Sequence, residues 1–86
     1  MTEYPALLDG DEGAYGVVFP DLPGIAAMGT TIDEALRHAA DALRDYALET
    51  ERDGDDLTPP SPAHSLRIPA DSRLVYIPLA SAPAQT

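Results

Sequence analysis

The spacing of hydrophobic residues divides the chain into short strand-like runs and one helical segment. Residues 3–8 and 14–19 are apolar runs rich in Leu, Val and aromatic residues, which is typical of β-strands. The Gly and Asp residues at 9–13 predict a turn, so that the two runs form a hairpin with a longer loop. Pro5 restricts part of the first strand to a sheet edge or a bulge. Residues 25–29 predict a third strand paired with the second.

The next segment has helical periodicity. Thr31 and Glu34 fit a capping box, in which the Thr31 hydroxyl accepts from the Glu34 amide and the Glu34 carboxylate reaches back. Apolar side chains then recur every three or four residues: Ile32, Leu36, Ala39, Leu43, Tyr46 and Ala47. This spacing predicts a helix from about residue 32 to about residue 52 that ends at Gly54, with Tyr46 in the core.

The rest of the chain adds a loop and a last strand. Residues 53–64 begin with acids and continue with prolines, which predicts an extended loop, and residues 73–77 predict a fourth strand. The order β-β-β-α-β predicts an α+β fold, a mostly antiparallel sheet with one long helix on one face. A chain of 86 residues has too little apolar material for two cores, so we expect one domain over 1–79 and a flexible tail over 80–86.

The charge balance narrows the classes of partner. Fifteen acidic residues face five basic ones, all Arg, which gives a net charge of −10. Such a chain repels phosphate, so we expect no direct binding of nucleic acid, and it attracts a basic partner. Cysteine is absent, which excludes disulfides and thiolate metal sites. No apolar run approaches the ~20 residues of a membrane span and no secretory signal is visible, so we expect a cytoplasmic protein without membrane contact.

The sequence predicts no catalytic residue, no metal site and no cofactor. A ribonuclease-H-type site needs several converging carboxylates, and only Asp21 lies at the end of a predicted strand. There is no nucleophile elbow, and His38 and His64 are isolated, so each is expected to be solvated or capped. The acidic run 53–56 lacks the ligand spacing of a calcium loop. The domain is therefore expected not to be an enzyme.

Two motifs together carry a family resemblance. The strand 15–19 runs directly into Pro-Asp-Leu-Pro-Gly at 20–24, and a short strand then leads through Gly29 to the helix start Asp-Glu-Ala-Leu at 33–36. This combination, over residues 4–79, resembles the HicB antitoxin family. The resemblance implies a β-β-β-α-β domain with a partial ribonuclease-H-like shape. It also implies a partner, the small basic ribonuclease toxin HicA, which the antitoxin binds and neutralises. Many members carry a C-terminal DNA-binding module, and the few residues after the fourth strand show none. Two alternatives stay open: a short variety of the family, or a longer protein from which this chain was trimmed.

The loop at residues 20–24 is the candidate contact site. Its prolines make it rigid, so it can present Asp21 and Leu22 to a partner at low entropic cost, and Tyr15 in the adjoining strand is a candidate hot spot. The alternative is a structural loop in which Asp21 bonds loop amides and Gly24 supplies an unusual φ.

A second function class stays open on the sequence alone. The chain could be a toxin-free homo-oligomeric scaffold with a regulatory or small-molecule-binding role. Marginal size favours a homo-oligomer in both cases, through a strand edge near Pro5 or through the last strand.

Overall fold

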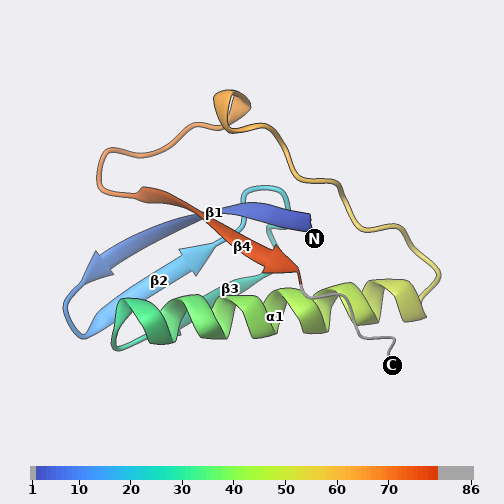
Figure 1. Ribbon diagram of the computed structural model, residues 1–86, viewed down its shortest axis with the longest axis horizontal. Coiled ribbons are helices and arrows are strands. Elements are labelled where there is room, and N and C mark those ends of the chain that lie inside the picture. Colours follow the sequence, from blue (N-terminus) through green and yellow to red (C-terminus); the bar gives the residue numbers. More distant parts are fainter. Residues whose placement is uncertain (1, 80–86) are drawn as a thin grey trace.

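The fold is a curved four-stranded sheet that holds one long helix against one face. The computed structural model describes residues 2–79, and the predicted tail 80–86 lies outside them. The elements are β1 (Thr2–Asp11), β2 (Ala14–Val18), β3 (Ala26–Gly29), α1 (Ile32–Arg52), the short 3₁₀ turn η1 (Ala63–Ser65) and β4 (Arg73–Leu79). The strand order is β3-β2-β1-β4 and all three pairings are antiparallel (Figure 1). The predicted α+β fold is confirmed.

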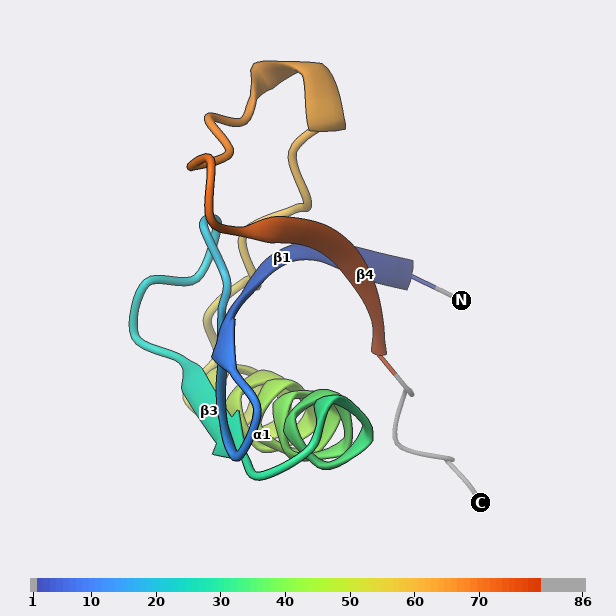
Figure 2. The same ribbon diagram turned by 90° about the vertical axis from the view of Figure 1, so that its left-hand side faces the viewer.

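The core lies between the sheet and the helix. Figure 2 shows the sheet curling around α1. Alternate residues of the strands point to one face, and on that face the buried apolar residues are Tyr4, Ala6, Leu8, Val17 and Ile77. The helix adds Ala35, Ala39 and Leu43, and each of these three side chains is fully buried. Small residues at 35 and 39 let the helix backbone approach the sheet closely.

The helix has the predicted ends. Its N-cap is Thr31, whose Oγ1 accepts from the Glu34 amide at 3.1 Å. The Glu34 carboxylate reaches back one residue further than the capping box predicts, and accepts from the Thr30 amide at 2.6 Å. After Asp53, Gly54 takes a φ of +79°, a conformation that glycine adopts without strain, and the chain leaves the helix there.

The core position predicted for Tyr46 is wrong. The residue is 38% exposed, although it lies on the same angular side of α1 as Ala39. Burial along this side of the helix ends at Leu43. Periodicity indicates which side of a helix faces a sheet, but not how far along the helix the sheet extends.

The hairpin is tighter than the predicted turn at 9–13. Strand β1 continues to Asp11, which pairs with Ala14, so only two residues, 12 and 13, connect the strands. Gly10 lies inside the strand with a φ of +104°, and a Cβ there would stand 2.2 Å from the Ala14 carbonyl oxygen. The glycine at position 10 is therefore needed where the two backbones approach closely, and it does not belong to a long loop.

Pro5 lies in an inner strand, but at a place where that strand has one neighbour. Pairing of β1 with β4 covers residues 2–8, whereas pairing with β2 begins only at Leu7. The first half of β1 is therefore an edge on its β2 side, which is where a residue without an N–H is tolerated.

Candidate partner-binding surface

The loop after β2 is built on three buried side chains. Phe19, Leu22 and Ile25 are each at most 6% exposed. Two consecutive turns bring them inward: the Leu22 amide donates to the Phe19 carbonyl at 3.0 Å, and the Ile25 amide donates to the Leu22 carbonyl at 3.0 Å. The loop is therefore held rigidly, with its prolines on the outside. Gly24 does not have a positive φ, so the unusual conformation considered for it is wrong.

Asp21 ties this loop to the proline-rich segment that follows the helix. Its Oδ2 accepts from the Ser61 amide at 2.7 Å, and its Oδ1 accepts from the Ser61 hydroxyl at 2.5 Å. A second tie lies nearby, where the Tyr4 hydroxyl donates to the Thr58 carbonyl at 2.6 Å. Burial raises the pKa of Tyr4 above its ordinary value, and the negative charge of Asp21 raises this pKa further. These hydrogen bonds hold residues 58–61 against the first half of β1 and the loop after β2.

The three residues predicted to contact a partner differ in burial and do not form one surface. Leu22 is 1% exposed and belongs to the core, so it has no surface to offer a partner. Tyr15 is half-buried at the start of β2 and packs against the core, whereas Asp21 follows the other end of that strand. Contacts of Tyr15 and Asp21 with a partner stay predictions, and the carboxylate oxygens of Asp21 are already engaged by Ser61.

The acidic side chains concentrate at the C-terminal end of α1. Between residues 49 and 56 there are five acids and one Arg, and all six side chains are exposed: Glu49, Glu51, Arg52, Asp53, Asp55 and Asp56. The C-terminal end of a helix already carries the negative end of its dipole, so acids there do not stabilise the helix. Their effect is to concentrate negative potential at one end of the molecule. We call residues 49–56 the acidic end.

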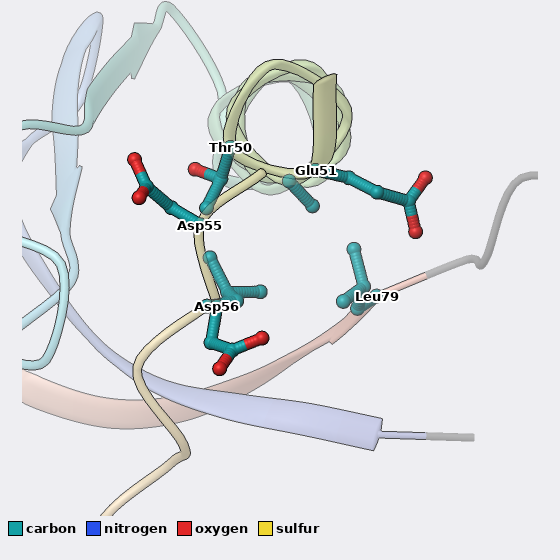
Figure 3. Close-up of a pocket in the computed structure, with 7 residues that line it drawn as sticks. Thr50, Glu51, Asp55, Asp56 and Leu79 are labelled. Atoms are coloured by element: carbon teal, nitrogen blue, oxygen red, sulfur yellow. The ribbon is translucent and has the colours of Figure 1, made fainter. Parts of the chain in front are cut away.

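A hollow of about 260 Å³ opens beside the acidic end (Figure 3). Its walls come from the last turns of α1, the loop after the helix and the end of β4: Ala47, Thr50, Glu51, Asp55, Asp56, Leu57 and Leu79. The Asp55 amide donates to the Thr50 carbonyl at 3.0 Å, which folds the loop back against the helix. The combination of apolar walls and carboxylates suits a Lys or Arg side chain, whose aliphatic stem can be buried while its charged head meets an acid.

The carboxylates around the hollow do not form a metal site. Figure 3 shows those of Glu51, Asp55 and Asp56 pointing in different directions. Within residues 2–79, no group of three or more His, Asp or Glu side chains could hold a metal ion. His38 is exposed, and its Nδ1 lies 2.7 Å from the Met28 carbonyl oxygen, as expected for a capped histidine. Over the same residues, no helix has the length and apolar character needed to span a membrane.

These features define a small acidic α+β domain in which hydrogen bonds join the loop after β2 to the loop after α1, and in which negative charge is concentrated at one end. The family model for the HicB-like antitoxin of bacterial toxin–antitoxin systems matches residues 4–73. The chain belongs to this family. No curated protein matches it.

Solved structures agree with the family. The N-terminal domain of the Burkholderia pseudomallei antitoxin HicB is similar with a TM-score of 0.80 and 27% identity, over 92% of this chain and 99% of that one. The Burkholderia pseudomallei antitoxin HicB has a TM-score of 0.77 and 28% identity, over 91% of this chain and 63% of that one. A chain of the HicA3 and HicB3 toxin–antitoxin complex shares the fold, with a TM-score of 0.69 and 20% identity, over 87% of this chain and 94% of that one.

Proposed function

We propose that this chain is an antitoxin that binds and neutralises a small basic ribonuclease toxin of the HicA type. Its membership of the HicB-like antitoxin family supports this role, and so does the similar fold of a chain from a toxin–antitoxin complex. The observation that carries the proposal is the acidic end, where five carboxylates add to the negative end of the helix dipole. We propose a binding role and no catalytic one.

The acidic end would act on the toxin in two stages. Negative potential focused at one end of a domain steers a basic protein toward that end and raises the association rate by about 10 to 1,000-fold at low salt. In the complex, the hollow receives a basic side chain of the toxin, with the Leu57 and Leu79 side chains against its stem and Glu51 or Asp56 beside its charge. Occupying the toxin's basic RNA-binding surface in this way excludes the RNA substrate.

The predicted role of Asp21 then takes a more specific form. Its bonds to Ser61 hold the same loop, residues 53–64, whose first residues line the hollow. We propose that Asp21 positions this loop for the toxin. Tyr15 lies on a different part of the molecule, and a contact with the toxin there would extend the interface along the sheet.

The test is copurification of this chain with the small basic protein encoded beside its gene, followed by an RNA-cleavage assay with and without this chain. Binding that suppresses cleavage supports the antitoxin role. If no basic neighbour exists, or if it does not bind, the antitoxin proposal fails and the toxin-free scaffold takes its place.

A matched pair of double variants locates the interface. Asp55→Asn with Asp56→Asn removes two carboxylates from the acidic end, and Asp9→Asn with Asp11→Asn removes two exposed ones near the β1–β2 turn, at the opposite end of the molecule (Figure 1). Both double variants change the net charge equally. We expect the first to weaken toxin binding about 10-fold or more and the second by about threefold or less, because only close charge pairs add strongly to affinity. Equal weakening by both variants would show that total charge matters and that the acidic end is not the contact site.

A further inference from the structure

One side of the hollow is a short piece of the loop after α1, residues 55–57, which we call the lining segment (Figure 3). Its first residue is held to the helix, because the Asp55 amide donates to the Thr50 carbonyl at 3.0 Å. Its other end is held from far away in the sequence: the Tyr4 hydroxyl donates at 2.6 Å to the carbonyl of Thr58, the next residue along. The lining segment is therefore a short span between two hydrogen-bonded points.

The Tyr4 side chain is a rigid anchor for the second of these points. Tyr4 is 3% exposed, and its neighbours on the helix side of the sheet, Ala6 and Ile77, are buried as well. Close packing of this kind fixes the torsions of the ring, and a buried tyrosine hydroxyl normally has a hydrogen-bond partner. Burial and the negative charge of Asp21 both raise the pKa of Tyr4, so the hydroxyl keeps the proton that it donates to a higher pH than an ordinary tyrosine does.

The wall of the hollow that comes from β4 is fixed to the same strand as Tyr4. Figure 3 shows Leu79 on the other side of the hollow from Asp55. In the β1–β4 ladder Thr2 pairs with Leu79, two residues before the pair of Tyr4 with Ile77. Both sides of the hollow are therefore fixed relative to β1, one through the ladder and the other through the Tyr4 hydroxyl.

We infer that Tyr4 is a positioning residue for the toxin contact: its hydroxyl sets the separation between Leu57 and Leu79, and with it the width of the hollow. The inference rests on the proposed function, in which both leucines pack against the stem of a basic side chain. Tyr4 is buried and acts without touching the toxin. Asp21 holds the same loop only at Ser61, beyond Thr58, so its effect on the hollow is smaller.

The free chain tests whether Tyr4 holds the lining segment. Tyr4→Phe removes the hydroxyl and keeps the ring in the core. Backbone-amide NMR relaxation and relaxation dispersion should show increased motion in this variant at residues 55–58 and not elsewhere. The matched control is Thr58→Ala, which keeps the bond because the acceptor is a backbone carbonyl, and its relaxation should match that of the parent chain.

Toxin affinity tests whether the width of the hollow matters for binding. Loss of one neutral hydrogen bond lowers the population of the binding-competent shape, and the apparent affinity falls by the same factor. We therefore expect Tyr4→Phe to bind the toxin about threefold to tenfold more weakly, measured by calorimetry at a temperature where every variant is folded. The control is Tyr76→Phe, which removes a hydroxyl from an exposed tyrosine on the other face of the sheet and should bind like the parent chain.

The outcomes separate this inference from the proposed function. Unchanged motion at residues 55–58 in Tyr4→Phe overturns the inference, whatever the toxin does. Unchanged toxin affinity in a variant whose lining segment has become mobile also overturns it, because the width of the hollow then has no effect on binding. A toxin that fails to bind the parent chain overturns the proposed function, and the relaxation data on the free chain still decide whether Tyr4 holds the lining segment.

Discussion

Replacing Asp21 by Asn tests the tie between the two loops without changing the size of the side chain. Both carboxylate oxygens accept from Ser61, one from the amide at 2.7 Å and one from the hydroxyl at 2.5 Å. Asparagine has one acceptor oxygen, which can accept from the Ser61 amide, and its NH₂ group can donate to the Ser61 hydroxyl oxygen, because a hydroxyl accepts as well as donates. Both bonds are therefore kept, but each becomes a bond between neutral groups.

The size of the effect follows from these two bonds. A hydrogen bond to a charged group contributes about 1.5–3 kcal/mol and a neutral one about 1 kcal/mol. Asp21 is only half-buried, so the lower figure applies to each of its bonds. Two such bonds contribute about 3 kcal/mol, of which the two neutral bonds of Asn retain about 2 kcal/mol, and the expected loss of unfolding free energy is about 1 kcal/mol. For a domain of this size that corresponds to a fall in Tm of about 4–8 °C.

Two measurements check this prediction. Thermal unfolding gives the change in Tm, with Asp41→Asn as the control, because Asp41 is an exposed acid on α1 and its replacement changes the net charge equally. An absorbance titration of the tyrosines gives a local readout: the charge of Asp21 contributes to the raised pKa of Tyr4, so Asp21→Asn should lower that pKa. If Asp21→Asn unfolds at the same temperature as Asp41→Asn and Tyr4 titrates unchanged, the tie does not stabilise the domain as argued.

Two further predictions concern the start of the helix. A Cβ at Gly29 would lie 2.4 Å from the Ala35 amide nitrogen, a backbone atom that cannot move aside. Gly29→Ala should therefore lower the free energy of unfolding, measured by urea denaturation, by about 1–3 kcal/mol. The control is Gly24→Ala, whose Cβ meets nothing within 4 Å and which should cost less than about 0.5 kcal/mol. Hydrogen bonds from the Thr30 amide and hydroxyl lower the pKa of Glu34 below its ordinary value. The contribution of Glu34 to stability is therefore present above that ordinary pKa and is lost as the pH falls through the lowered pKa. Glu34→Gln should remove this part of the acid destabilisation, and equal urea midpoints for the two proteins across the acid range would contradict the assignment.

The parts of the fold that the sequence predicts are those governed by local rules. The capping box and the three- and four-residue spacing of apolar side chains define α1 to within its observed bounds. The β-rich runs locate all four strands, although each strand differs from its predicted limits by one to three residues at one end or both. The burial of the core side chains follows from the helical period of about 3.6 residues in α1 and the period of two residues in the strands.

What the sequence does not predict depends on residues that are distant along the chain. Asp21 meets Ser61 across 40 positions and Tyr4 meets Thr58 across 54, and no periodicity records such pairs. Leu22 looks like an exposed residue of a proline-rich loop, yet two consecutive turns direct it into the core. The hollow at the acidic end also combines α1, the following loop and β4, so its lining could not be read from any one segment.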